Sequence, residues 1–418
     1  MTLLIGTTII VFPFDQGILL LGTSVEPERQ YVLVGGQNGT WFQSGQAPRL
    51  YQILLPEYSA TPLMPVTSQG TVWGGSWNGS QWLISGWGTD SGINGSNPYI
   101  YLHDGREQVV AGTLTLYSSE SSWHGGDIFA ASYNGKQWLL SGLGSGIFPA
   151  ISGQVSNHMS LATFDGYRFT DLSALVPRQD DAILYANAWN GRYWLVGGGY
   201  GRPYYPIARK VLFMFDGAKV NDLTAQAEEQ VATFGPVQTI GWNGRYWLIG
   251  GVGFLATFDG RNFVDLTSEL SSLIGSGFNV NAMAWNGQEW MLAGGFPVAQ
   301  LLPGKAWVVT YSGSQFMDLS EFLPWYVTGT TQTSSVLSVA FANSSWILGG
   351  YSKPYGGMLL SYGNGAFKDL SYFAKDMSYV TWVGAGVLKD SAQMRSPDFA
   401  FVSSPIVLLC SVLLQDDD

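Results

Sequence analysis

The residue types that carry most enzymatic chemistry are sparse in this chain. Only three histidines occur, His103, His124 and His158, and no two of them stand at a spacing typical of a metal site. The sequence contains no calcium loop of the Asp-x-Asp-x-Asp-Gly type and no glycine-rich phosphate loop ending in lysine. The single cysteine, Cys410, can form no internal disulfide and lies in an apolar run typical of a buried strand. We therefore assign no catalytic residues and expect no metal ion and no cofactor.

Carboxylates are more frequent, and two of them about 5–9 Å apart could hydrolyse a glycosidic bond. Three aspartates recur once per repeat at a predicted turn, which indicates a structural role: Asp165, Asp216 and Asp259. Asp127 is not repeated, and it follows Trp123 and His124 in a segment that precedes a predicted strand. Because binding residues are concentrated in loops, Trp123, His124 and Asp127 form one candidate ligand site.

Aromatic side chains could stack on the apolar faces of sugars, and they make up 14% of the chain. The most conspicuous unrepeated group gives a second candidate ligand site, and its members are Tyr200, Arg202, Tyr204 and Tyr205. Similar insertions hold further unrepeated aromatic residues, namely Trp87 with Tyr99 and Tyr101, Trp325 with Tyr326, and Tyr351 with Tyr355. The alternative is that these loops simply fold over their own hydrophobic surface.

Four Asn-x-Ser/Thr sequences are candidate glycosylation sites, at Asn38, Asn78, Asn94 and Asn343. Three of them coincide with predicted hairpin turns, at Asn38, Asn78 and Asn343, and we expect these to share one face of the fold. The motif is short and arises by chance in turns rich in these residues.

The elements that must position these residues are the strands of an internal repeat. Residues 77–86 (WNGSQWLISG) recur as residues 133–142 and again from Trp189, Trp242 and Trp285. Asn-Gly between apolar strands predicts a hairpin, with a type I′ turn that needs positive φ at both central residues. An Asp-Gly turn follows, and then an Asp-Leu-Ser/Thr ending that indicates an Asx-type turn. Each unit is thus four antiparallel strands, A–B joined at Asn-Gly and C–D at Asp-Gly. Such units at a period of about 40–50 residues are β-propeller blades.

The number of blades depends on the two apolar ends of the chain. Seven A–B hairpins can be counted, the first with its turn at Asn38. Residues 399–408 resemble an A–B pair that lacks its C–D pair, and residues 9–20 resemble a C–D hairpin that lacks its A–B pair. Joining them would remove exposed sheet edges. We therefore expect an all-β fold, a single propeller domain over residues 1–418 with eight blades, closed by residues 1–22 and 379–418. Seven blades is the alternative.

The repeat resembles the kelch class of β-propellers. Gly-Gly after the second strand, followed by an apolar strand ending in aromatic-Asp, is clearest in residues 193–198 and 211–216. Strand D carries Asp-Leu where kelch repeats usually place a Trp. Galactose oxidase shares this class, but its copper site needs a Tyr–Cys pair and histidine ligands, which this chain does not supply. The resemblance therefore implies a fold and not an activity.

Charge and hydropathy restrict the partners. The net charge is −11 and charged residues make up 12% of the chain, which opposes binding to nucleic acid or to an anionic membrane surface. Neither apolar end predicts a membrane span or a signal peptide. We expect a glycan or protein partner at the propeller loops, no nucleic-acid partner, and a chain that can assemble into a larger surface structure.

The function that fits these features is non-catalytic. We expect an extracellular or cell-surface protein for adhesion or assembly, able to bind carbohydrate through aromatic loops. One alternative is a carbohydrate-active hydrolase or lyase with its site in the central funnel, and another is an intracellular kelch-like scaffold. Clustered carboxylates with perturbed pKa values in the funnel would favour the enzyme, whereas an apolar funnel would favour binding.

Overall fold

The computed structural model of the chain describes fourteen segments, which are residues 9–14, 17–22, 29–38, 47–55, 58–63, 69–89, 97–104, 108–109, 126–146, 156–177, 182–200, 209–296, 304–329 and 333–388. The chain divides into two compact units, Tyr31–Gly386 and a smaller unit of Met1–Gln30 with Val387–Asp418. In the smaller unit, β1 (Ile9–Phe14) and β2 (Gly17–Gly22) form an antiparallel hairpin.

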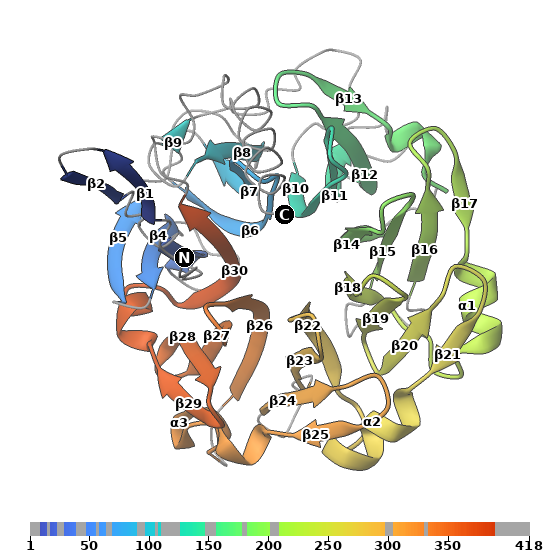
Figure 1. Ribbon diagram of the computed structural model, residues 1–418. Helices are drawn as coiled ribbons and strands as arrows, with labels where there is room; N and C mark the ends of the chain where they lie inside the picture. The colour runs from blue at the N-terminus through green and yellow to red at the C-terminus, as the bar shows by residue number, and fades with distance from the viewer. Residues whose placement is uncertain are drawn as a thin grey trace, which may run out of the picture. The chain divides into compact units, whose positions relative to one another are not determined.

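Seven four-stranded sheets formed by the described residues stand in a ring (Figure 1). Six are continuous in sequence. Blade 1 is β6 (Gln69–Trp77), β7 (Trp82–Thr89), β8 (Asn97–His103) and β9 (Gln108–Val109). Blade 2 is β10 (Gly126–Tyr133), β11 (Trp138–Gly146), β12 (Ser156–Phe164) and β13 (Phe169–Asp171). Blade 3 is β14 (Ile183–Trp189), β15 (Trp194–Tyr200), β16 (Arg209–Phe215) and β17 (Val220–Asp222).

The second half of the ring repeats this order. Blade 4 is β18 (Val237–Trp242), β19 (Trp247–Gly251), β20 (Phe254–Phe258) and β21 (Phe263–Asp265). Blade 5 is β22 (Asn279–Trp285), β23 (Trp290–Gly295), β24 (Ala306–Tyr311) and β25 (Phe316–Asp318). Blade 6 is β26 (Thr333–Ala342), β27 (Ser345–Lys353), β28 (Gly356–Gly363) and β29 (Ala366–Asp369). The closing blade is β30 (Tyr379–Leu388), β3 (Arg29–Asn38), β4 (Ala47–Leu55) and β5 (Ser59–Leu63).

The expectation of eight blades is therefore wrong, because the described four-stranded sheets number seven. The error lies at β3, which the sequence pattern suggested was the first strand of a new blade. It is instead the second strand of the closing blade, next to β30. The sequence of residues 30–36 (QYVLVGG) corresponds to residues 192–198 (RYWLVGG) of a second strand, with Val32 in place of Trp194. The missing Trp concealed this match.

The hairpin turns follow from local hydrogen bonding. In blade 1 the carboxamide oxygen of Asn78 accepts the backbone N–H groups of Ser80 (2.9 Å) and Gln81 (2.8 Å). Positive φ is confined to Gly79, at 98°, so the turn is not of the expected type I′, which needs positive φ at both central residues. In blade 6 both Asn343 and Ser344 have positive φ, 48° and 59°, as type I′ requires.

The paired glycines of the second strands allow close packing within and between blades. A Cβ atom on Gly197 would lie 2.6 Å from Cγ1 of Val237 in the next blade, and one on Gly198 would collide with the carbonyl oxygen of Ile183. The hydrophobic core accordingly lies between neighbouring blades. For example, Leu195 of blade 3 and Trp247 of blade 4 are buried in one cluster. The ring is therefore stabilised by each blade packing on the next.

The Asp-Leu-Ser/Thr ending forms a clasp in blades 2 to 6, as the Asx-turn prediction required. In blade 4 a carboxylate oxygen of Asp265 accepts the backbone N–H of Thr267 (2.9 Å). The Thr267 hydroxyl then accepts the N–H of Leu255 (3.1 Å) and donates to its carbonyl (3.3 Å). Short helices follow these clasps, namely η1 (Ser173–Leu175), α1 (Thr224–Gln230), α2 (Thr267–Ile274), η2 (Ser320–Phe322) followed by α3 (Trp325–Thr328), and η3 (Ser371–Ala374).

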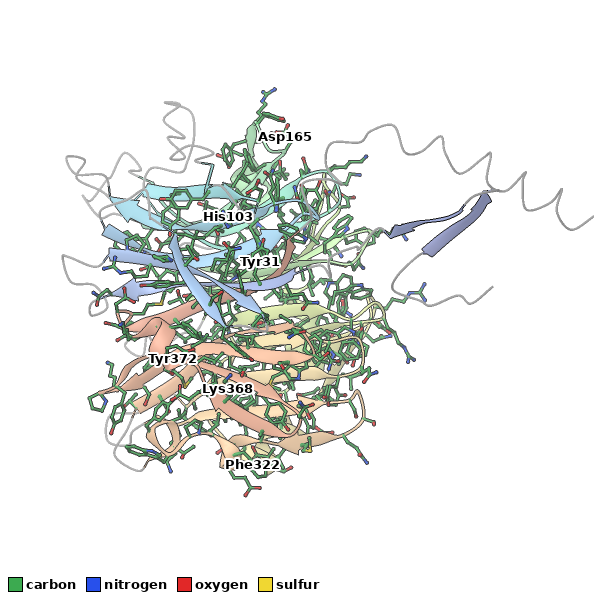
Figure 2. All side chains as sticks on the ribbon, turned by 60° about the vertical axis from the view of Figure 1, so that its left-hand side comes forward. Tyr31, His103, Asp165, Phe322, Lys368 and Tyr372 are labelled. Atoms are coloured by element: carbon green, nitrogen blue, oxygen red, sulfur yellow. The ribbon has the colours of Figure 1, made fainter. Side chains whose placement is uncertain are left out.

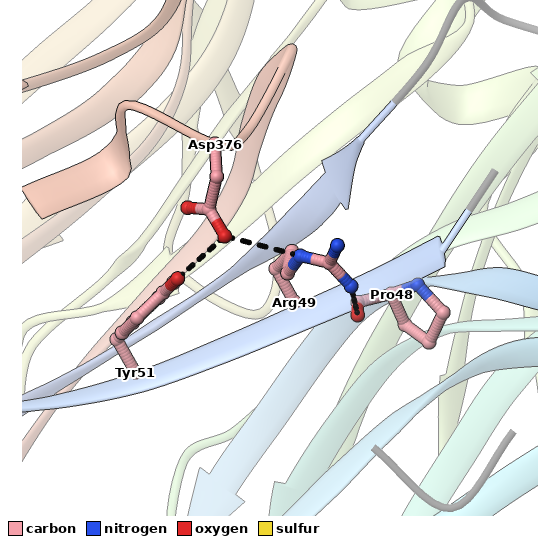
Figure 3. A network of polar contacts seen from close by, with 4 residues as sticks. All are labelled: Pro48, Arg49, Tyr51 and Asp376. Atoms are coloured by element: carbon pink, nitrogen blue, oxygen red, sulfur yellow. Dashed lines mark hydrogen bonds and ion pairs between the residues drawn. The ribbon is translucent and has the colours of Figure 1, made fainter. Parts of the chain in front are cut away.

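The closing blade is tied to the segment that follows blade 6. One carboxylate oxygen of Asp376 accepts hydrogen bonds from Arg49 Nε at 3.2 Å and from the Tyr51 hydroxyl at 2.6 Å (Figure 3). Lys368 of β29 lies over the ring of Tyr58, with its Nζ 3.8 Å from the ring centroid. Because these residues are far apart in sequence, the contacts join the two ends of the ring. Among the described residues, no helix has the length and apolar character needed to cross a bilayer.

Candidate functional site

The structure places few of the sequence-predicted ligand residues. Trp123 and His124, like Arg202, Tyr204 and Tyr205, lie outside the described residues. Tyr200 ends β15, and its side chain is not described either. Neither predicted cluster is therefore tested as a cluster, and both remain predictions.

Asp127 is described, near the start of β10, and its environment is unusual. The residue is partly exposed, but burial of the carboxyl group raises its pKa to about 7. Its charge contributes to raising the pKa of the Tyr99 hydroxyl, after the larger effects of burial and of Tyr101. Perturbed pKa values of this kind are concentrated at functional sites.

The repeated aspartates serve turns, as the sequence predicted. One carboxylate oxygen of Asp165 accepts the backbone N–H groups of Tyr167 (2.8 Å) and Arg168 (2.7 Å). These hydrogen bonds hold the pKa of Asp165 below its usual value, and Asp216 and Asp259 are held in the same way. Figure 2 shows Asp165 at the end of a projecting hairpin. An aspartate that caps its own turn is not available as one of a catalytic pair.

Three of the four candidate glycosylation sites are described, and they do not share one face. Asn78 and Asn343 lie at the turns after the first strands of blades 1 and 6. Asn38 ends the second strand of the closing blade, so it lies at the opposite end of its sheet from such a turn. Asn94 lies outside the described residues. Glycosylation itself remains a prediction at all four.

Three unrepeated aromatic residues from two loops meet on the surface of the ring. We call Trp325, Tyr326 and Tyr355 the aromatic corner. Trp325 and Tyr326 begin α3, and Tyr355 lies in the turn between β27 and β28. The ring centroid of Trp325 lies 6.2 Å from that of Tyr326 and 5.8 Å from that of Tyr355. The plane of the indole makes angles of 89° and 81° with the planes of these two phenol rings. The two phenol rings thus stand almost perpendicular to the indole.

The aromatic corner is exposed although its members are large and apolar. Trp325 is 70% exposed and Tyr355 is 56% exposed. Phe322, three residues before Trp325, and Tyr372, which follows Ser371, are also exposed aromatic side chains (Figure 2). The corresponding connection after blade 3, helix α1, instead exposes Glu228 and Glu229. The connection after blade 5 therefore differs from the repeat in carrying exposed aromatic residues. Contiguous exposed apolar surface often marks a binding site.

Polar contacts from three segments hold the aromatic corner in place. The Ser352 hydroxyl donates to the Tyr326 carbonyl, and the Tyr326 hydroxyl lies 3.3 Å from the Ser371 hydroxyl oxygen. Val327 is buried and its carbonyl accepts a hydrogen bond from Ser334 at 2.6 Å. Burial raises the pKa of the Tyr326 hydroxyl, which keeps the group neutral. The exposed rings therefore project from an ordered base.

The centre of the ring contains a cavity of about 340 Å³. The first strand of every blade contributes to its lining, and the lining residues include no Asp, Glu, Lys, Arg or His. The sequence left open whether carboxylates cluster in the funnel, and none belongs to this lining. Metal-binding clusters of His, Cys, Asp and Glu are also absent from the described part of the chain.

The architecture defines the class of this protein as a seven-bladed β-propeller. No protein-family model and no curated protein matches the chain. Among solved structures, the chain is similar to the β-propeller domain of the Trilobed protease from Pyrococcus furiosus, with 9% identity, a TM-score of 0.47, and coverage of 83% of this chain and 93% of that one.

Two further solved structures are similar at the same level. Acylaminoacyl peptidase from Pyrococcus horikoshii is 10% identical, with a TM-score of 0.46 and coverage of 81% of this chain and 50% of the peptidase. YCF48, solved with a bound D1 peptide, is 11% identical, with a TM-score of 0.44 and coverage of 77% of this chain and 86% of that one. These similarities concern the fold alone, and they assign neither an activity nor a kelch-like repeat to this chain.

Proposed function

We propose that this β-propeller is a non-catalytic binding protein that holds a neutral carbohydrate on the aromatic corner. The observation that carries the proposal is the exposed indole of Trp325, which is 70% exposed and flanked by two perpendicular phenol rings. A pyranose has one apolar face of C–H groups and a rim of hydroxyl groups. The apolar face can lie on the indole, while the rim meets the edges of the upright rings and the hydroxyl group of Tyr355.

Preorganisation of the corner supports the same proposal. An immobile aromatic surface loses little conformational freedom when a ligand binds, which favours affinity. The contacts of Ser352 and Ser371 with Tyr326 supply that rigidity. The neutral lining of the central cavity favours binding over glycoside hydrolysis, because hydrolysis in the funnel would need two carboxylates there.

An extracellular or cell-surface location, with a role in adhesion or assembly, forms part of the proposal. It rests on the low proportion of charged residues, 12%, and on the four Asn-x-Ser/Thr sequences. A glycan or protein partner displayed outside the cell would then reach the outer edge of blade 6 and its neighbours.

A glycan array tests the proposal. The full chain should bind neutral oligosaccharides, and Trp325→Ala should lose that binding by about tenfold or more, because stacking and burial of the indole both disappear. Tyr167→Ala is the matched control, since Tyr167 is 97% exposed on blade 2 and lies outside the aromatic corner. Equal binding by the two variants, or an array with no neutral glycan bound, would contradict the proposal.

A further inference from the structure

The cavity at the centre of the ring is lined by an irregularity that recurs in the first strands of six blades. In β10 the pairing with β11 shifts between Ile128 and Ala130, which leaves Phe129 outside the regular register. The same shift occurs in the first strands of blades 1 and 3 to 6. β-Bulges of this kind redirect side chains and are common next to functional sites. We call the residue that each shift leaves out of the regular pairing, such as Phe129, the bulge residue. The bulge residues line the central cavity.

On one side the bulge residues are aromatic. Trp73, Phe129 and Tyr185 come from three consecutive blades and form an arc along the cavity lining. The ring centroids of Trp73 and Phe129 are 5.3 Å apart, and those of Phe129 and Tyr185 are also 5.3 Å apart. All three side chains are half-buried, so each keeps accessible surface. This arc offers apolar contact to one face or edge of a ring-shaped ligand.

On the other side the bulge residues are amides. Gln238 and Asn281 belong to blades 4 and 5, which lie three to four places around the ring from Trp73. Asn281 uses its amide N–H groups within the protein, donating to the Ser335 hydroxyl at 2.8 Å and to a backbone carbonyl at 2.9 Å. Gln238 Oε1 is buried and has no hydrogen-bond partner among the described residues. A buried acceptor without a donor is unfavourable, so a rotation of the Gln238 side chain that brings this oxygen to a ligand donor in the cavity would be stabilising.

The chemistry of the lining restricts the ligand. A charged ligand would lose its hydration without meeting an opposite charge, because the lining residues are all neutral. A sugar carries hydroxyl groups around its whole rim, and those facing the aromatic arc would lose their hydrogen bonds. A flat ring with polar groups on one edge satisfies both sides. A volume of about 340 Å³ falls within the range of small-molecule sites.

We propose that the central cavity binds a small, neutral heteroaromatic compound that carries an N–H donor on one edge. The ring contacts Trp73, Phe129 and Tyr185, and the N–H group donates to Gln238 Oε1 once that side chain has turned toward the cavity. This site is separate from the aromatic corner and does not depend on the function proposed for it.

Fluorine NMR on the full chain labelled with 5-fluorotryptophan tests this site. The Trp73 resonance is identified as the one missing from Trp73→Phe. Nicotinamide, benzamide and indole serve as neutral probes at millimolar concentration, and nicotinate serves as the anionic counterpart of nicotinamide. We expect at least one neutral probe to shift the Trp73 resonance in a saturable manner, and nicotinate to bind at least tenfold more weakly than nicotinamide.

Two variants identify the partners of the probe. Gln238→Leu keeps the side-chain size and removes the acceptor, and Tyr185→Ala shortens the arc, so each should weaken binding by about tenfold. Trp325→Ala is the control and should leave the titration unchanged. Unshifted positions of the other fluorotryptophan resonances show that each variant is folded. The proposal is overturned if no neutral probe shifts the Trp73 resonance, or if Gln238→Leu and Tyr185→Ala both bind as tightly as the parent chain.

Discussion

Replacing Thr267 by Val tests whether the clasp at the end of each blade stabilises the ring. Thr267 and Val have similar volumes, so the change removes the hydroxyl group and little else. Two hydrogen bonds disappear, the one accepted from the N–H of Leu255 at 3.1 Å and the one donated to its carbonyl at 3.3 Å. The carbonyl keeps the N–H of Leu266 at 2.9 Å, but the N–H of Leu255, a buried residue, loses this acceptor. An unpaired buried donor predicts a loss of about 1–3 kcal/mol in the free energy of unfolding.

The assay for this prediction combines urea unfolding with hydrogen exchange at the Leu255 amide. Ser268→Ala is the matched control, because the Ser268 hydroxyl bonds only the exposed Glu269 carboxylate at 2.9 Å. That change should alter stability by less than about 0.5 kcal/mol. We expect Thr267→Val to lower the urea midpoint and to accelerate exchange in the peptide that contains Leu255. If both variants behave alike in both measurements, the clasp does not stabilise the blade and the reasoning fails.

Two predictions concern pH. Burial raises the pKa of Asp127 to about 7, whereas the same group in the unfolded chain has a pKa of about 3.9. Between these two pH values the folded state binds the proton and the unfolded state does not. The free energy of unfolding should therefore fall as the pH rises from about 4 to about 7. Asp127→Asn should flatten that part of a curve of urea midpoint against pH, and an unchanged slope would show that another group is responsible. The pKa of Tyr51 is raised to about 12, chiefly by burial and then by its hydrogen bond to Asp376. The folded state therefore keeps the phenol proton, and its contribution to stability should be lost as the pH rises from about 10 to about 12. Asp376→Asn should lower the Tyr51 pKa in a difference titration of tyrosine absorbance, and identical titration curves would contradict this.

The sequence predicts the blade well because the determinants of a hairpin are local. In the hairpin around Asn190, Trp189 and Trp194 face each other across the turn, with their ring centroids 4.4 Å apart. The number of blades is less accessible because ring closure is a long-range choice. β3 follows β2 in the chain but lies beside β30. Only the likeness of residues 30–36 to other second strands indicates the correct position.

The candidate sites, too, depend on long-range contacts that the sequence does not reveal. Trp325, Tyr326 and Tyr355 can be recognised individually as unrepeated aromatic residues, but their meeting depends on how α3 lies against the β27–β28 turn. The aromatic arc in the cavity cannot be read from the chain, because one extra residue at each bulge changes which side chain faces inward. The only local sign of a bulge is a recurring apolar residue followed by an unrepeated residue, as in Val72 and Trp73.

Carbohydrate binding at the aromatic corner is measured most directly by calorimetric titration with the strongest neutral glycan from the array. We expect saturable binding to the full chain, a loss of about tenfold or more in affinity for Trp325→Ala, and partial recovery with Trp325→Phe, which restores an aromatic face. Tyr167→Ala should bind like the parent chain. Unchanged affinity in Trp325→Ala would contradict the central claim.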